Sequence, residues 1–194
     1  LDNVDVVKLL SRVIMDLAEG EIKQNLNRYD SGQTFSTYLN KSYCKTASLI
    51  ANSSKAAGVL SDISIDKLEM LYEFGKNIGL AFQVVDDILD FTGNDKQLGK
   101  PAVSDLASGY LTAPVLYALE ENKNLSVLID RELAEEDDLN NALEMIMNSG
   151  AIKKSRVLAE DFATHSKDAI SWLPESEYKM ALMALPEFVL SRLY

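Results

Sequence analysis

The chain has 194 residues, which suits one well-cored domain, and a net charge of −11, which argues against a general affinity for nucleic acid. No apolar run reaches the ~20 residues of a membrane-spanning helix. A single cysteine excludes an internal disulfide and favours a reducing compartment, the cytoplasm or, in a plant or alga, the plastid stroma. The chain starts at Leu1 in sequence typical of mid-protein helix, so we expect a longer protein with residues upstream.

Apolar residues recur at steps of three and four along most of the chain, whereas the alternating pattern of strands is missing from the sequence. This periodicity predicts an all-α fold, with residues 1–194 as a single domain. The predicted helices span about 4–28, 35–60, 64–93, 112–121, 136–148, 151–171 and 176–193. We expect residues 93–111 to be irregular and residues 130–138 to form a solvated loop or the start of a helix.

The longest predicted helix lies between Ser64, a suitable N-cap, and Gly93, a natural stop. Gly75 and Gly79 lie one turn apart within it, and each costs roughly 1 kcal/mol in a helix interior. A close approach by another helix or by a ligand would explain both glycines. Thr112 is predicted to cap the helix that follows the irregular stretch.

An acidic stripe lies on the same long helix. Asp86 and Asp90 are one turn apart beside Asp87, in apolar surroundings, with no lysine or arginine one turn away on this helix. Burying these carboxylates unpaired would cost several kcal/mol each. A divalent cation would remove that cost, and oxygen-only ligands select a hard ion such as Mg²⁺. The alternative is a solvent-facing stripe paired with lysines from other segments, and spacing alone leaves both interpretations open.

A basic stripe lies earlier in the chain. Lys41 and Lys45 are one turn apart, and Lys45 with Thr46 offers an ammonium and a hydroxyl to one anion. The alternative is a solvated basic helix face. Lys100 follows a glycine but does not belong to a P-loop, because Pro101 stands where Ser or Thr is required. A lysine in this loop is still close enough in sequence to the acidic stripe to reach a phosphate.

The only histidine and the only cysteine are expected to be structural. His165 has no neighbouring histidine or cysteine in the sequence, so a core or surface position is expected for it. Cys44 suits a small packed side chain. One residue of each type excludes a zinc site built from cysteines and histidines.

Taken in chain order, several segments resemble the trans-type isoprenyl diphosphate synthases. They are Gly20-Glu21, residues 38–47 (YLNKSYCKTA), 79–90 (GLAFQVVDDILD), 98–101 (LGKP), Asp105-Leu106 and 112–114 (TAP). The similarity runs over essentially the whole chain and is greatest to cyanobacterial and plastid long-chain enzymes of the solanesyl type. It implies a helical bundle of the isoprenoid-synthase type whose N-terminal helices are missing from this chain.

The resemblance implies a magnesium-dependent prenyltransferase that forms a homodimer. Such an enzyme condenses isopentenyl diphosphate with an allylic diphosphate and produces an all-trans polyprenyl diphosphate. By resemblance, Asp86 binds one Mg²⁺ directly, and Asp87 and Asp90 support it through water or through contacts to the direct ligands.

The resemblance also assigns the substrate site. Lys45 and Lys100 stabilise the departing diphosphate, while Thr46 and Gln83 lie beside the allylic carbon. Phe82, which precedes Gln83 in the motif, is expected to contact substrate with these residues.

Two departures from the family pattern narrow this interpretation. The family's first aspartate-rich motif and the arginine pair after it are not in this chain, so we expect half an active site and no activity from these 194 residues alone. Tyr110 stands where many members carry a lysine. The alternatives are a non-catalytic subunit that shares the fold, a terpene cyclase, and a purely structural helical domain.

Overall fold

The computed structural model describes residues 2–93 and 103–193, and over these ranges the chain is helical without a strand. The helices are α1 (Val4–Leu26), α2 (Phe35–Ser42), the π-helical turn η1 (Tyr43–Ala47), α3 (Ser48–Leu60), α4 (Ile65–Thr92), α6 (Ser104–Ala107), α7 (Ala113–Glu121), α8 (Lys123–Asp130), α9 (Asp138–Asn148), α10 (Ala151–Ala169) and α11 (Glu177–Ser191). The all-α prediction is confirmed. Within the described ranges, none of these helices is both long enough and apolar enough to cross a membrane.

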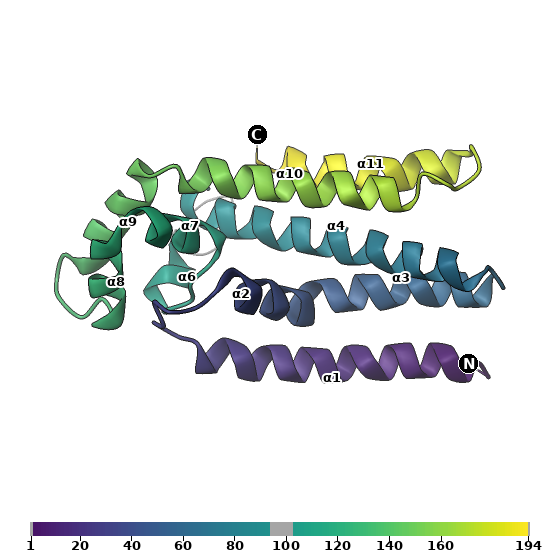
Figure 1. The fold of residues 1–194 in the computed structure, drawn as a ribbon, viewed down its shortest axis with the longest axis horizontal. Coiled ribbons are helices and arrows are strands. Elements are labelled where there is room, and N and C mark those ends of the chain that lie inside the picture. Colours follow the sequence, from purple (N-terminus) through teal and green to yellow (C-terminus); the bar gives the residue numbers. More distant parts are fainter. Residues whose placement is uncertain (1, 94–102, 194) are drawn as a thin grey trace.

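The long helices lie side by side in layers (Figure 1). α1 packs on α3, α3 packs on α4, and α10 covers the other side of α4, with α11 returning along α10. The short helices α6, α7, α8 and α9 gather at one end of these layers (Figure 1). α4 therefore lies in the middle of the bundle, and apolar side chains such as Val84, Val85 and Ile88 are fully buried on it. This burial positions the polar residues of the same helix.

The two glycines of α4 lie where α3 and η1 come closest to it. A Cβ on Gly75 would lie 2.5 Å from the carbonyl oxygen of Ile50, and one on Gly79 would lie 2.5 Å from Cα of Ala47. The predicted close approach of another helix is therefore confirmed. It presses η1, which carries the Lys45-Thr46 pair, directly against α4.

The predicted helix at 35–60 is continuous but contains a π-helical turn that the periodicity did not predict. In this turn the amide of Ser48 donates to the carbonyl of Tyr43, five residues back. A π turn accommodates one extra residue and changes the direction of the side chains around it; such turns are frequent at functional sites. Lys45 and Thr46 both belong to η1.

Most predicted helix boundaries are confirmed to within two or three residues, with exceptions. α8 (Lys123–Asp130) was not predicted, and α6 (Ser104–Ala107) lies within the stretch expected to be irregular. α4 and α7 begin directly after Ser64 and Thr112, but neither side chain accepts a capping hydrogen bond. Gly93 ends α4 at φ −78°, so its stop does not use the left-handed conformation.

Residues 130–138, which were predicted to form a solvated loop or the start of a helix, contain both, since α9 begins at Asp138. Asp138 is 1% exposed and accepts hydrogen bonds from the guanidinium of Arg131, which also pairs with Glu135. The hydrogen bond from Arg131 holds the pKa of the Asp138 carboxyl below its ordinary value. An ion pair between the exposed Arg131 and the buried Asp138 therefore closes the turn between α8 and α9.

Candidate active site

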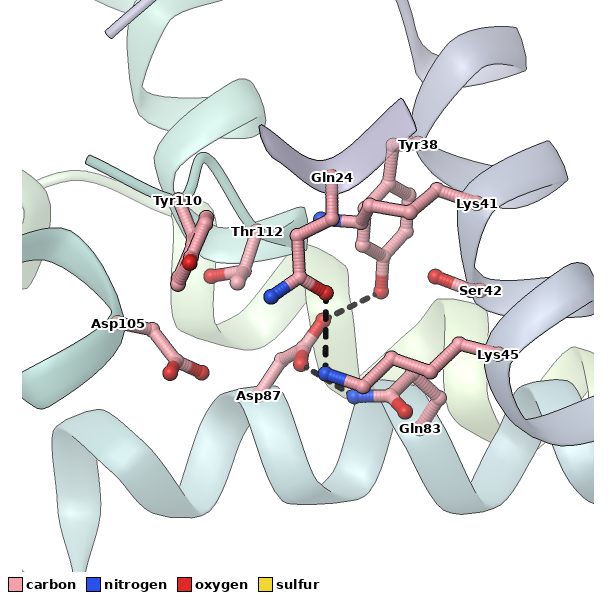
Figure 2. A pocket seen from close by; sticks show the side chains of 10 residues that line it. All are labelled: Gln24, Tyr38, Lys41, Ser42, Lys45, Gln83, Asp87, Asp105, Tyr110 and Thr112. Atoms are coloured by element: carbon pink, nitrogen blue, oxygen red, sulfur yellow. Dashed lines mark hydrogen bonds between the residues drawn. The ribbon is translucent and has the colours of Figure 1, made fainter. Parts of the chain in front are cut away.

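A small polar pocket opens where η1 and the end of α2 face the C-terminal half of α4, with α1 and the segment after α6 at its sides (Figure 2). Its lining residues are Gln24, Tyr38, Lys41, Ser42, Lys45, Gln83, Asp87, Asp105, Tyr110 and Thr112. It has room of about 30 Å³, which suffices for one or two water molecules. Charged side chains of both signs line this space.

Asp87 forms the floor of the pocket and is 2% exposed (Figure 2). The Tyr38 hydroxyl donates to Oδ2 at 2.6 Å, and Nε2 of Gln83 donates to Oδ1 at 2.9 Å. Burial raises the pKa of Asp87 to about 6, although both hydrogen bonds and the Lys41 charge act in the opposite direction. Both carboxylate oxygens are therefore held in place in a setting that disfavours their charge.

The two lysines of the pocket differ in their surroundings. Burial lowers the pKa of the Lys41 ammonium against the attraction of Asp87, and this ammonium lies 5.6 Å from the centroid of the Tyr38 ring. Lys45 is exposed, and its Nζ donates to the neutral Oε1 of Gln24 at 3.0 Å. Because an amide oxygen carries no net charge, a nearby anion would compete well for the Lys45 ammonium.

Thr46 and Gln83 come together across the contact between η1 and α4. Oγ1 of Thr46 donates to Oε1 of Gln83 at 2.8 Å, and Gln83 in turn donates to Asp87. A chain of hydrogen bonds thus orients the carboxamide, with its oxygen toward Thr46 and its nitrogen toward the buried carboxylate. The structure brings together Lys45, Thr46 and Gln83, which the sequence placed in one site.

Asp86 points away from this pocket, toward the end of α11. Its Oδ1 lies 2.7 Å from Nη2 of Arg192, and the two side chains are 38% and 33% exposed. The guanidinium also lies over the ring of Phe82, 4.6 Å from its centroid. Phe82 and Asp86 therefore form a second, more open part of the site beside the polar pocket.

Asp90 anchors α6 and is 1% exposed. Its carboxylate accepts from the Ser104 hydroxyl and from the amide of Asp105, each at 3.1 Å, and its backbone oxygen accepts from the amide of Val103. Val103 has φ +62°, an unusual conformation for a β-branched residue. Asp90 thereby supports the turn that presents Asp105 to the pocket.

The three predicted metal ligands thus diverge in the structure. Asp87 points into the polar pocket, Asp86 pairs with Arg192, and Asp90 holds α6. Lys100, which was also predicted for this site, lies outside the described residues.

The described residues contain another group of possible ligands, between α1 and η1. The side chains of Asp16, Glu19 and Cys44 lie within 4.8 Å of one another. Arg12 pairs with Asp16 at 2.8 Å and Lys23 pairs with Glu19 at 2.6 Å. Each carboxylate therefore already has a cation from α1 itself, and the Ser48 hydroxyl of α3 donates to Oδ2 of Asp16 at 2.5 Å, so this group belongs to the packing of α1 on its neighbours. Cys44 is buried, as predicted.

Besides Lys41 and Tyr110, five lining residues were not predicted as site residues: Gln24, Tyr38, Ser42, Asp105 and Thr112. Tyr38 shares a helix face with Lys41 and Lys45 at spacings of three and four, so this periodicity could have identified it. Gln24, Asp105 and Thr112 come from α1 and from the segment after α4, and no local pattern links them to Asp87. Oγ1 of Thr112 is buried without a hydrogen-bond partner among the described residues, which leaves a polar atom available to a ligand.

Comparisons with known proteins agree over the whole chain. Residues 1–146 match the family model described as "Polyprenyl synthetase". A prenyl transferase of Synechocystis sp. is 54% identical over 194 residues, which are 100% of this chain and 60% of that protein. Solanesyl-diphosphate synthase 2, chloroplastic, of Oryza sativa subsp. japonica is 45% identical over 100% of this chain and 48% of its own length. The chain therefore spans about half to 60% of these curated relatives.

Solved structures share the same arrangement of helices. Heptaprenyl diphosphate synthase from Staphylococcus aureus superposes with a TM-score of 0.93 at 31% identity, over 100% of this chain and 62% of that one. A polyprenyl synthase from Caulobacter crescentus CB15, complexed with calcium and isoprenyl diphosphate, superposes with a TM-score of 0.89 at 33% identity, over 100% of this chain and 60% of that one.

Proposed function

The chain belongs to the polyprenyl synthetase family, and from that premise we propose that it supplies one part of the active site of a magnesium-dependent prenyltransferase. The reaction joins isopentenyl diphosphate to an allylic diphosphate and yields an all-trans polyprenyl diphosphate. The observation that carries this proposal is the chain of hydrogen bonds from Thr46 through Gln83 to Asp87, with Lys45 directly beside it. Relatives named solanesyl diphosphate synthase support a long-chain product.

The lysines supply the charge that a departing diphosphate needs. When the carbon–oxygen bond of the allylic diphosphate breaks, both electrons leave with the diphosphate, and a cation fixed nearby stabilises the new charge. Lys45 is suited to this role because its ammonium is exposed and, among the residues that the structure describes, donates to the neutral amide oxygen of Gln24. Lys41 adds a second positive charge at the pocket, and we assign the same role to Lys100, which follows α4 in the sequence.

Thr46 and Gln83 are suited to stabilise the positive charge that forms on the allylic carbon. The allylic carbon becomes positive as the bond breaks, until the double bond of isopentenyl diphosphate attacks it and a proton is lost. Since the Thr46 hydroxyl donates a hydrogen bond to Gln83, the lone pairs of its oxygen remain available to a neighbouring positive centre. The bond from Gln83 to Asp87 keeps the carboxamide in this orientation. Phe82, one residue earlier, offers an apolar ring to the substrate beside them.

The donor set of α4 fits Mg²⁺. Asp86, Asp87 and Asp90 offer only oxygen ligands, which hard divalent cations prefer. Asp86 is partly exposed and so accessible as a direct ligand, while burial disfavours the charge of Asp87 and leaves it in need of a nearby cation. Asp86 would hold the ion directly with support from the other two. A magnesium ion there would draw negative charge from the departing diphosphate.

We further propose that residues 1–194 form a single domain, that they are inactive without the rest of a longer protein, and that the protein is a homodimer. An apolar face on α1 supports a contact with further protein. Its exposed side chains include Val4, Val7, Ile14, Met15, Ile22 and Leu26. A patch of this kind usually marks an interface.

The proposal is tested by incorporation of radiolabelled isopentenyl diphosphate, using the longer protein with and without Asp86→Ala. We expect the substitution to reduce turnover by at least roughly a hundredfold, since a charged ligand to the metal is lost. Asp66→Ala, an exposed aspartate in the first turn of the same helix, is the matched control and should leave turnover unchanged. Unchanged turnover in Asp86→Ala would remove the basis for the metal assignment.

A further inference from the structure

Arg192, which follows α11, makes an incomplete set of contacts. Its Nη2 pairs with Oδ1 of Asp86 at 2.7 Å, and the plane of its guanidinium covers the Phe82 ring. Its Nη1 is buried and has no hydrogen-bond partner among the residues that the structure describes. A guanidinium carries five N–H donors in a planar fork that suits two parallel bonds to a phosphate. Here, part of that fork has no acceptor.

The position of Arg192 conflicts with the role proposed for Asp86. A magnesium ion on the Asp86 carboxylate and a guanidinium on the same carboxylate would repel each other at short range. This repulsion favours movement of Arg192 away from Asp86 when a metal ion binds there. Its long side chain, only one-third exposed, would then need another anion nearby, and a metal-bound diphosphate is the anion that the proposed reaction brings to this part of the site.

The helix that carries Arg192 is held independently of the Asp86 contact. Lys167 on α10 pairs with Glu187 on α11 at 2.7 Å, and Arg156 on α10 donates to the carbonyl of Leu193 at 3.4 Å. The guanidinium can thus change partner by rotation of its own side chain, without movement of α11. The Phe82 ring provides a flat apolar surface on which it can turn.

We propose that Arg192 is a diphosphate-binding residue that also protects the metal ligand Asp86. Without metal its guanidinium neutralises Asp86, and with metal and diphosphate bound it transfers to the diphosphate oxygens. This inference rests on the proposed function, because it takes Asp86 as a metal ligand. It predicts effects of opposite sign for the metal alone and for the metal with diphosphate, which a purely structural ion pair would not produce.

The test uses the longer protein and two probes, Mn²⁺ alone and Mg²⁺ with inorganic pyrophosphate, with affinities from calorimetry. Arg192→Met should bind Mn²⁺ several-fold more tightly than the wild type, because the competing cation is gone. The same variant should bind pyrophosphate with Mg²⁺ roughly tenfold more weakly, because two charge-assisted hydrogen bonds are lost. Arg192→Lys, which keeps the charge without the fork, should restore the wild-type affinity for Mn²⁺ but not for pyrophosphate.

Two further variants separate the possible failures. Lys167→Met removes another ion pair of α11 and should leave both affinities unchanged; a change equal to that of Arg192→Met would mean that only the anchoring of α11 matters. Asp86→Asn should weaken Mn²⁺ binding at least roughly tenfold, because a charged ligand is lost. If it does so while Arg192→Met matches the wild type with both probes, the role of Arg192 is wrong and the metal assignment stands. If neither the wild type nor Arg192→Met binds either probe, both are wrong.

Discussion

The hydroxyl of Tyr38 donates a 2.6 Å hydrogen bond to Oδ2 of Asp87, which lies 49 positions further along the chain. Both side chains are buried, and the bond joins α2 to the C-terminal part of α4 at the floor of the polar pocket (Figure 2). It compensates part of the cost of burying the Asp87 charge.

Tyr38→Phe should destabilise the protein by about 1–3 kcal/mol, because it leaves one oxygen of a buried carboxylate without its donor. Urea denaturation at pH 7 measures the free energy of unfolding. Tyr43→Phe is the matched control: it removes a hydroxyl pair with Tyr72 at 2.6 Å, but both groups are neutral and half-buried. We expect about 1 kcal/mol or less there. Equal losses in the two variants would contradict the special role of the Asp87 contact.

Gly79→Ala should disturb both stability and the site. The new Cβ would lie 2.5 Å from Cα of Ala47, so η1 must move away from α4, at a cost of about 1–3 kcal/mol. Because Thr46 precedes Ala47, its hydrogen bond to Gln83 should weaken as well. Gly150→Ala is the control, since its Cβ would meet only the flexible Glu121 carboxylate at 3.3 Å. Urea denaturation of both variants checks the expectation; a loss in Gly79→Ala no larger than in Gly150→Ala would refute it.

Arg131→Met should reduce the dependence of stability on acid pH. The hydrogen bond from Arg131 lowers the pKa of Asp138 in the folded protein. The resulting stabilisation is present above the ordinary aspartate pKa of about 3.9 and is lost as the pH falls through the lower folded pKa. Free energies of unfolding at pH 7 and at pH 3 should therefore differ more in the wild type than in Arg131→Met. Lys8→Met, which removes a highly exposed pair with Asp5, should keep the wild-type difference.

Thr46→Val should lower the turnover of the longer protein by roughly tenfold or more, which corresponds to at least about 1.4 kcal/mol of transition-state stabilisation. The substitution keeps the shape of the side chain but removes the oxygen that we propose faces the allylic carbon, together with the donor to Gln83. Thr46→Ser keeps the hydroxyl and should stay near wild-type turnover. Steady-state assays with radiolabelled isopentenyl diphosphate measure both; a Thr46→Val enzyme as fast as Thr46→Ser would argue against a role for the hydroxyl.

Local spacing was sufficient to predict most of the helices, because the burial of one helix face leaves a period of three to four residues in the sequence. The same reasoning predicted the close approach at Gly75 and Gly79, since a glycine is costly in a helix interior unless a neighbour needs the space. The motifs around Lys45-Thr46 and Gln83 were also visible in the sequence, as was the acidic stripe of α4.

Only the tertiary structure decided the direction and the partner of each of these side chains. Asp86, Asp87 and Asp90 form one motif, yet they contact Arg192 after α11, Tyr38 on α2 and Ser104 on α6, respectively. Nor did spacing predict the π turn that carries Lys45 and Thr46. Helix periodicity depends on residues within one or two turns, whereas hydrogen bonds and ion pairs join segments whose proximity is set by the packing of whole helices. The sequence therefore determined the acidic stripe. The fold decided that Asp87 lies in the buried polar pocket, whereas Asp86 pairs with Arg192 in the more open region beside it.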